Sequence, residues 1–440
     1  MHSMRVLVLL SVVALSFVLL RCWTPGASGT GDPAAATSSE GVRFLSAPVK
    51  AAETEPRPAP VQEETHAEAA PPVAPPAAAP EAPPIDPRWA AEAVPQVAGE
   101  GAELRVAAAL VHGKPPEVQA AAATLPEPRA RLVEAFAWAL AGERQMALDL
   151  SKKIAKDSVP SQEGAYLEAA LAGRAAVPAA SAETSISLAM EMVLLSKAAR
   201  EALAAGRYAE AAGQYSDLLV GELGAPWAAD PRVLTEWTQG LNEAQRRHRW
   251  NPRGEWPGAE LTVQSGESLI AVRKRFLGEH PEALMCTGLI ERANDVQGFL
   301  QPGQKLRIPT DPVRVYVDLG ARWALYFLGD EVAAAWPVGI GRPGEETPPG
   351  DYTVKDKIEN PPWMKVGQEA IPYGDPRNPL GSRWLGWAQG GHKTSYGFHG
   401  TTQPESIGKA ESDGCVRFRN EDVQVLFQIL PEGAPIHIQG

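Results

Sequence analysis

A histidine and a cysteine near the C-terminus are the pair of residues in this chain best suited to joint chemistry. His399 lies in Phe398-His-Gly-Thr-Thr402, and Cys415 follows sixteen residues later in Ser412-Asp-Gly-Cys-Val-Arg-Phe418. A thiolate attacks carbonyl carbon, and an imidazole takes and returns the proton, so the two side chains would suffice for acyl transfer. The other cysteines are Cys22, in the N-terminal apolar segment, and Cys286, in an apolar run where we expect a buried thiol. Cys415 is therefore the candidate nucleophile.

The neighbours of this pair suit the same chemistry. Gly414 allows close approach of the backbone, and consecutive N–H groups there could hold a developing oxyanion. Arg417 would point to the same side of a strand as Cys415 and could bind a carboxylate through two hydrogen bonds, although an ordinary surface salt bridge is the alternative. His392 and His399 lie in a Gly-rich segment that does not suit a metal-binding helix. We predict no metal or cofactor.

Length and charge limit the class of protein. A chain of 440 residues suggests about three domains. A net charge of -12 without a basic stripe argues against a nucleic-acid binder. Residues 6–20 are uncharged and follow Arg5, and as a helix they would span only about 22 Å, short of a bilayer core of about 30 Å. We predict that residues 1–23 are a signal peptide or signal anchor and that the chain is exported to the cell envelope or periplasm, secreted or anchored.

Two segments of different composition follow. Residues 24–86 are rich in Ala and Pro without apolar periodicity, which predicts a disordered linker. Residues 87–254 are predicted to be α-helical, with glycines that each follow an apolar stretch and would end a helix in the left-handed conformation: Gly113, Gly142, Gly173 and Gly206. The stretch Lys197–Tyr215 resembles a tetratricopeptide helix–turn–helix, with Tyr208 and Tyr215 filling the groove between helices; plain Ala-rich packing is the alternative. Such a region would serve protein contact or spacing.

Residues 261–309 form a different unit. They open with Leu261-Thr-Val-Gln-Ser-Gly-Glu-Ser-Leu269, which predicts a strand, a turn and a helix start, and close with Leu300-Gln-Pro-Gly-Gln-Lys-Leu-Arg-Ile-Pro309, a turn before a short strand. The unit resembles a LysM module, a small βααβ domain. That resemblance implies binding to the glycan strands of peptidoglycan or to chitin.

Residues 313–440 read as a mainly-β domain. Strands are predicted at 314–318, 322–327, 331–340, 351–354 and 435–438. This domain resembles the L,D-transpeptidase catalytic domain, through blocks that occur in the family's order: Val338-Gly-Ile-Gly341, Thr347-Pro-Pro-Gly-Asp-Tyr-Thr-Val354, Asn378-Pro-Leu-Gly381, Gly397-Phe-His-Gly-Thr401 and Ser412-Asp-Gly-Cys-Val-Arg417.

The resemblance implies a role for each residue of the site. Cys415 would be the nucleophile, acylated by a peptidoglycan stem peptide, and His399 the general base and acid. The Gly400 carbonyl would orient the imidazole, and the Gly414 and Cys415 amides would form the oxyanion site. Arg417 would hold a substrate carboxylate. The thioester would pass to an amine of a second stem.

One residue departs from the family pattern. Asp413 stands where the family most often has His, and its charge should disfavour the thiolate unless a cation neutralises it. We expect Asp413 to pair with Arg417 or His399 and to tune the thiol.

Two further functions fit the same sequence. An L,D-carboxypeptidase or an enzyme that attaches envelope proteins to the wall would use the same acyl-enzyme with a different acceptor. A non-catalytic wall-binding scaffold would use only the glycan-binding module and the helical region.

Overall fold

A computed structural model describes residues 101–440, except 156–157, 176–181, 183, 255 and 365–368. The predicted signal segment 1–23, the predicted linker 24–86 and residues 87–100 lie outside the described residues. Across the described residues, no helix combines the length and apolar character that a bilayer crossing requires.

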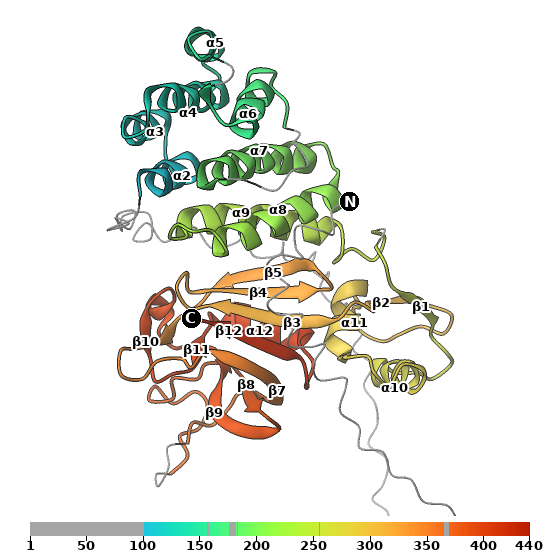
Figure 1. The fold of residues 1–440 in the computed structure, drawn as a ribbon. Helices are drawn as coiled ribbons and strands as arrows, with labels where there is room; N and C mark the ends of the chain where they lie inside the picture. Colours follow the sequence, from blue (N-terminus) through green and yellow to red (C-terminus); the bar gives the residue numbers. More distant parts are fainter. Residues whose placement is uncertain (1–100, 156–157, 176–181, 183, 255, 365–368) are drawn as a thin grey trace, which may run out of the picture. The chain divides into compact units, whose positions relative to one another are not determined.

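The segment predicted to be helical is helical as far as it is described (Figure 1). Two of its helices begin at side-chain caps, because Thr184 accepts a hydrogen bond from the Ser187 amide and Asp230 from the Arg232 amide. The helices are α2 (Ala102–His112), α3 (Pro115–Ala122), α4 (Glu127–Leu140), α5 (Arg144–Ser151), α6 (Ser161–Leu171), α7 (Ser185–Ala204), α8 (Tyr208–Leu223) and α9 (Pro231–Arg247).

The prediction that four glycines end helices in the left-handed conformation is confirmed at three positions and wrong at one. Gly142, Gly173 and Gly206 follow helix ends with φ of 86°, 69° and 75°, as left-handed residues. Gly113 instead has φ of -99° and is extended, so that prediction is wrong. A Cβ at Gly113 would lie 2.6 Å from the Ala109 carbonyl oxygen. Glycine is needed there for close approach of the backbone and not for a left-handed turn.

Helices α8 and α9 pack through Tyr215, one of the two tyrosines predicted to fill the groove between helices. Tyr215 is buried, and a Cβ on Gly240 of α9 would lie 2.2 Å from its ring. The glycine therefore makes the space into which the tyrosine ring fits. Tyr208 is only half-buried, and Arg247 lies over its ring, with 5.8 Å between the guanidinium carbon and the ring centroid. Of the two tyrosines, only Tyr215 fills the groove as expected.

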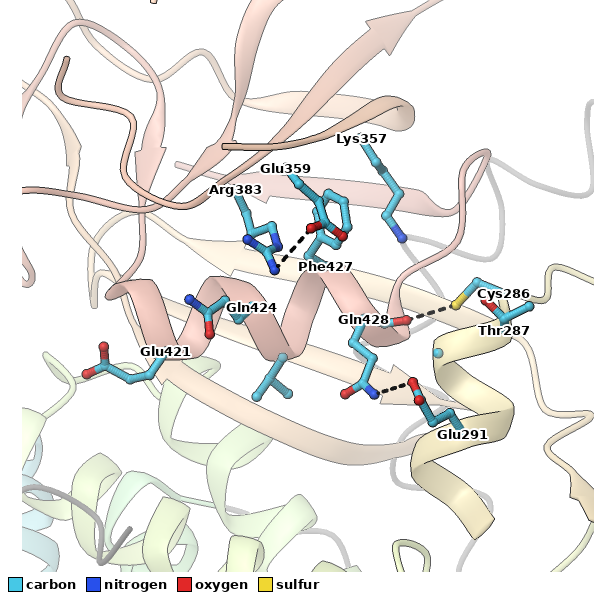
Figure 2. A pocket seen from close by; sticks show the side chains of 12 residues that line it. Cys286, Thr287, Glu291, Lys357, Glu359, Arg383, Glu421, Gln424, Phe427 and Gln428 are labelled. Carbon is cyan, nitrogen blue, oxygen red and sulfur yellow. Dashed lines mark hydrogen bonds and ion pairs between the residues drawn. The ribbon is translucent and has the colours of Figure 1, made fainter. Parts of the chain in front are cut away.

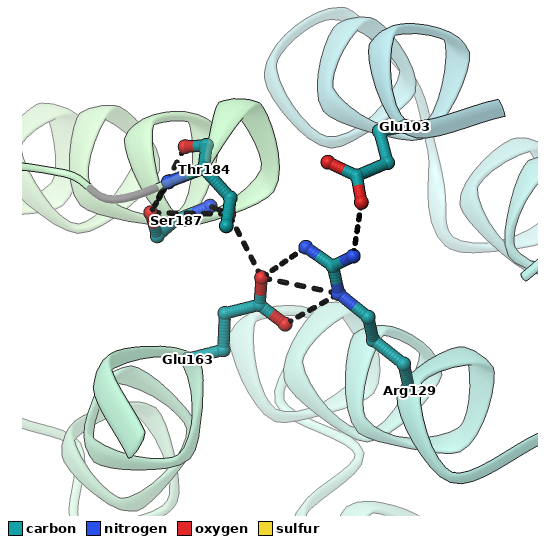
Figure 3. A network of polar contacts seen from close by, with 5 residues as sticks. All are labelled: Glu103, Arg129, Glu163, Thr184 and Ser187. Carbon is teal, nitrogen blue, oxygen red and sulfur yellow. Dashed lines mark hydrogen bonds and ion pairs between the residues drawn. The ribbon is translucent and has the colours of Figure 1, made fainter. Parts of the chain in front are cut away.

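A buried ion pair joins the first helices of this region (Figure 3). Arg129 of α4 contacts Glu103 of α2 and donates to Glu163 of α6, with 2.9 Å between Nε and Oε2. Glu163 is fully buried and also accepts a hydrogen bond of 2.9 Å from the Thr184 hydroxyl, at the N-cap of α7. These hydrogen bonds raise the pKa of Arg129, and the network fixes how four helices meet.

The following unit has the strand–helix–helix–strand order expected for residues 261–309. Ser268 caps the first helix by accepting a hydrogen bond from the Ala271 amide at 3.3 Å. The two strands pair antiparallel, and the first begins at Ala259, two residues before the predicted boundary. The elements are β1 (Ala259–Thr262), α10 (Leu269–Glu279), α11 (Thr287–Asn294) and β2 (Lys305–Ile308).

An eight-stranded sheet forms the body of the C-terminal domain, in the order β11-β9-β8-β7-β12-β3-β4-β5. Its strands are β3 (Val313–Asp318), β4 (Trp323–Leu328), β5 (Glu331–Pro337), β7 (Gly350–Glu359), β8 (Arg383–Gln389), β9 (His392–His399), β11 (Val416–Arg417) and β12 (Pro435–Gln439). A separate pair of strands is formed by β6 (Ile340–Gly341) and β10 (Ala410–Ser412). The described chain also contains α12 (Asn420–Ile429) in this domain.

The predicted strand 331–340 is divided into β5 and β6. The chain leaves its partner strand β4 after Pro337 and turns to β11, where the Gly339 amide and carbonyl both bond to the backbone of Arg417, at 2.9 and 2.8 Å. The end of the predicted strand 331–340 therefore bonds to the strand that follows Cys415 and does not continue β5.

Helices α8 and α9 cover the edge strand β5. The Ser216 hydroxyl accepts from the Val332 amide at 2.9 Å, and the Gln245 side chain donates to the Val332 carbonyl at 2.9 Å. Arg249, just beyond α9, pairs with Asp311 at 2.8 Å. Covering an edge strand satisfies backbone groups that would otherwise template pairing with another chain.

A cavity of about 540 Å³ lies among α11, α12 and strands β7 and β8 (Figure 2). Cys286 lines it and is half-buried, more exposed than the sequence predicted. Its thiol donates to the Gln428 carbonyl at 3.1 Å, and burial raises the pKa of the thiol. The thiol of Cys286 is thus held in its protonated form.

Candidate active site

His399 ends one strand, and Cys415 immediately precedes the parallel strand beside it. Strand β9 ends at His399, and β11 lies beside it with Val416 opposite Phe398 and Arg417 opposite His399. Cys415 immediately precedes β11, and its sulfur lies against the backbone of β9. The sheet therefore brings the two predicted residues to the ends of adjacent strands. The connection between them contains β10, which pairs with β6.

The imidazole of His399 is buried and held in one tautomer. Its Nδ1 lies 2.6 Å from the Gly400 carbonyl oxygen, and because a carbonyl only accepts, Nδ1 carries the proton. The Trp384 ring stacks beside it, with 6.1 Å between ring centroids. Burial lowers the pKa of His399 to about 4, with the Arg417 charge acting in the same direction and backbone hydrogen bonds to Gly400 and Leu380 against it. At neutral pH the ring is uncharged, and its Nε2 holds a lone pair that can accept a proton.

The thiol of Cys415 is protonated in the free protein. Its pKa is raised to about 11, chiefly by burial and to a smaller extent by the Asp413 charge, against the Gly397 backbone and Arg417, which lower it. The sulfur lies 3.9 Å from the Ser395 carbonyl oxygen as a weak donor. A base must therefore remove the proton as the sulfur reacts.

The turn before Cys415 requires glycine for two reasons. Gly414 has φ of 98°, a conformation that side chains disfavour, and an added Cβ would lie 2.7 Å from the Tyr396 ring. The Ser412 hydroxyl closes the turn by donating to the Cys415 carbonyl at 2.6 Å. The backbone around the thiol is thus fixed before any ligand arrives.

Asp413 has a different partner from the one expected. Its carboxylate pairs with Arg342, at 2.8 Å, and not with Arg417 or His399. Arg342 follows β6, whose pairing with β10 brings it beside the turn, and its amide also donates to the Ser412 carbonyl at 2.9 Å. The expectation overlooked Arg342 because nothing in the local sequence links it to this turn.

Arg417 is half-buried beside both reactive groups. Arg417 lies opposite His399 in the pairing of β11 with β9 and two residues after Cys415. Its charge lowers the pKa of both residues, and its own pKa is lowered by burial. Its Nε is buried without a hydrogen-bond partner among the described residues. The ordinary surface salt bridge considered above is not seen among the ion pairs of the described residues. The guanidinium thus remains available to a ligand.

Sequence reasoning missed three residues that shape the site: Trp384, Arg342 and Asn420. Trp384 covers the imidazole, and Arg342 neutralises Asp413. Asn420, at the start of α12, bonds to Ser382, just before β8, and to Thr401, two residues after His399. The only sequence signal for α12 was an apolar spacing of three residues at Val423, Leu426 and Ile429, all of which are buried.

Fold and site together define a cysteine-dependent acyltransferase, and comparisons with known proteins agree. Residues 312–438 match the YkuD family, the L,D-transpeptidase catalytic domain. The putative L,D-transpeptidase YqjB of Bacillus subtilis is 39% identical over 132 residues, which are 30% of this chain and 73% of that protein. The putative L,D-transpeptidase YkuD of the same organism is 29% identical over 182 residues, 40% of this chain and 96% of that one. The chain belongs to the L,D-transpeptidase family.

Solved structures give matches to the same family. One is the NMR structure of the catalytic domain from the Enterococcus faecium L,D-transpeptidase, at 24% identity and a TM-score of 0.24, covering 29% of this chain and 97% of that one. Another is an L,D-transpeptidase from Mycobacterium smegmatis, at 22% identity and a TM-score of 0.25, covering 31% and 64% of the two chains.

Proposed function

We propose that this enzyme cross-links peptidoglycan stem peptides through a thioester on Cys415. The observation that carries the proposal is the neutral, oriented imidazole of His399 on the strand beside the thiol. Its Nε2 takes the proton from sulfur while sulfur attacks the donor stem's peptide carbonyl. The proton then passes to the leaving amine, and a terminal D-alanine departs. The products are a thioester and a free amino acid.

The second half-reaction returns the enzyme to its starting state. An amine of a neighbouring stem attacks the thioester carbonyl, and His399 accepts one of its protons. The new amide bond forms as the carbon–sulfur bond breaks, and the proton returns to the Cys415 thiolate. Water in place of the amine would give a carboxypeptidase, and a protein amine would give an attachment enzyme.

The remaining residues have supporting roles in this proposal. The Gly414 and Cys415 amides would donate to the oxyanion in each tetrahedral intermediate, since the fixed turn presents consecutive N–H groups. Arg417 would bind a substrate carboxylate, which agrees with its half-buried guanidinium and unpartnered Nε. Asp413, paired with Arg342, would tune the thiol.

Incubation with tetrapeptide-containing muropeptides and mass spectrometry tests the proposal and its alternatives. We expect cross-linked dimers with release of D-alanine, and none with Cys415→Ala. Tripeptides in place of dimers would favour hydrolysis. An unchanged substrate that is still bound would favour the scaffold.

We propose in addition that residues 261–309 are a LysM module that binds the glycan of the cell wall. Phe299 and Ile270 support this, because they are 96% and 70% exposed on a small unit with little reason to expose apolar groups. Ile270 lies in the first turn of α10 and Phe299 in the segment between α11 and β2; Val263, just after β1, bonds to the end of that segment through its amide and carbonyl, to Gln304 and Gly303 at 2.8 Å. Tethering to glycan would raise the local concentration of stems.

Cosedimentation with purified peptidoglycan sacculi tests the module. Phe299→Ala combined with Ile270→Ala should reduce binding, whereas Met146→Ala, which removes an exposed apolar side chain from α5, should not. Equal binding by both variants would contradict the proposal. These activities would place the enzyme in the cell envelope, with the helical region serving as a spacer or a contact for a protein partner.

A further inference from the structure

Asn420 joins the two chain segments that flank the base. Its Oδ1 accepts a hydrogen bond from the Ser382 amide at 3.0 Å, just before β8. Its Nδ2 donates to the Thr401 carbonyl at 2.8 Å, two residues after His399. One side-chain amide therefore makes the contacts that a backbone peptide would make between the ends of β8 and β9.

Two glycines leave room for this amide. A Cβ on Gly400 would lie 2.1 Å from the Asn420 Oδ1, and a Cβ on Gly381 would lie 2.2 Å from the same atom. The Gly400 amide also donates to the Arg383 carbonyl at 3.2 Å. The Gly400 amide is thus bonded to the start of β8, and the Asn420 side chain packs against the Cα of Gly400 and bonds to the carbonyl of the next residue, Thr401.

The Gly400 carbonyl is the group that orients His399. It accepts the Nδ1 proton at 2.6 Å, and that bond decides which ring nitrogen is left as a base. The backbone of His399 is held separately, because its carbonyl accepts from the Phe418 amide at 2.8 Å. The direction of the Gly400 carbonyl is therefore the remaining freedom in the placement of the imidazole.

We infer that Asn420 is a positioning residue for His399, which acts through the Gly400 backbone to keep the Nδ1 hydrogen bond in place and Nε2 available as the base. The inference rests on the proposed role of His399 as the base. Asn420 lies only five residues after Cys415 in the chain. The same short segment thus supplies the nucleophile and fixes the base.

Three variants of the full chain test this inference. Asn420→Ala removes both hydrogen bonds. Asn420→Asp is nearly isosteric and keeps the acceptor for Ser382, but it loses the donor to Thr401 and adds a negative charge near the imidazole. Gln424→Ala is the matched control, since Gln424 lies one turn further along α12 and bonds only to the Ser382 hydroxyl, at 3.0 Å.

Two measurements separate positioning from a structural role. The first is the rate of acylation by ertapenem, followed by the intact mass of the protein; displacement of a base by about 1 Å costs on the order of 100-fold, which we expect for Asn420→Ala. Gln424→Ala should stay within about twofold, as for a neutral surface change. The second is the pH titration of the His399 ring by NMR, assigned with His399→Gln. Asn420→Ala, which adds no charge, should move this titration to lower pH, because it weakens the Gly400 hydrogen bond that raises the pKa of the ring.

A merely structural clamp would lower the melting temperature without moving the His399 titration. Acylation of folded Asn420→Ala and Asn420→Asp at the wild-type rate, with an unchanged His399 titration in Asn420→Ala, would overturn the inference. If Asn420→Ala does not fold, the near-isosteric Asn420→Asp decides. If the wild-type protein itself is not acylated, the proposed function fails, while the His399 titration still decides the role of Asn420.

Discussion

The Asp413 carboxylate lies 2.8 Å from the Arg342 guanidinium, and this ion pair stands at the turn that carries Cys415. Both side chains are more than half exposed, so water and salt screen the pair. The Asp413 charge still raises the pKa of the thiol. Arg342 therefore offsets, in part, the cost of a carboxylate two residues from the nucleophile.

Removing Arg342 and removing Asp413 should shift the pKa of the Cys415 thiol in opposite directions. Arg342→Ala leaves Asp413 unpaired and should raise the pKa of Cys415, whereas Asp413→Asn should lower it, each by less than about one unit as expected for an exposed pair. The pH dependence of Cys415 alkylation by iodoacetamide measures both shifts. In the double variant, the effect of Arg342→Ala should largely disappear. If Arg342→Ala shifts the pKa of Cys415 just as much when Asp413 is already replaced by Asn, the arginine acts on the thiol directly.

Replacement of Asp413 by histidine tests whether the departure from the family pattern is an impairment. Because Arg342 already neutralises the carboxylate in part, we expect Asp413→His to change acylation by a carbapenem only modestly. A large gain in rate would identify Asp413 as a defect of this site.

Trp384 sets the acid side of the pH profile by covering His399. The pKa of His399 is lowered to about 4 chiefly by burial, so a neutral ring is available above that pH and is lost as the pH falls through it. Trp384→Ala would admit water and raise the pKa toward its ordinary value of about 6.5. The acid limb of the acylation rate should therefore move to higher pH. Trp384→Phe, which keeps an aromatic cover, should move it less; equal profiles for both variants and the wild type would contradict this account.

The sequence was sufficient for the parts of the site that depend on local spacing. His399, Gly400, Gly414 and Cys415 lie in short motifs, and the strands around Gly320 and Gly329 follow from apolar runs, alternating in β3 and continuous in β4 and β5, that are separated by turns. Strands β8 and β9 were not predicted, because their apolar residues do not alternate regularly and register shifts interrupt their pairing. The ion pair of Asp413 with Arg342 and the contacts of Asn420 beside Gly400 could not be predicted. Arg342 and Asn420 reach the site only through the sheet topology.

Gly414 should tolerate no side chain. Its φ of 98° strains any other residue by about 1–3 kcal/mol, and a Cβ would meet the Tyr396 ring at 2.7 Å. Gly414→Ala should thus displace the turn and slow acylation of Cys415. Combining it with Tyr396→Ala removes the collision but not the strain, so the double variant should recover only part of the rate. Full recovery would show that the φ angle is unimportant, and unimpaired acylation by Gly414→Ala alone would contradict both reasons for the glycine.

The buried carboxylate of Glu163 makes the helical region sensitive to a single substitution far from the chemistry. Removing it leaves the Arg129 guanidinium without its main partner in a poorly solvated place, which typically costs about 3–5 kcal/mol. Glu163→Ala should therefore lower the unfolding temperature of the helical region, measured by calorimetry on the full chain. The control is Glu127→Ala, which removes the partner of Arg131 in an exposed pair and should cost about 0.5 kcal/mol or less. Acylation of Cys415 should be unchanged in both variants below the transition, because neither residue contacts the catalytic domain. A loss of acylation in folded Glu163→Ala would instead reveal coupling between the helical region and the site through the helices that cover β5.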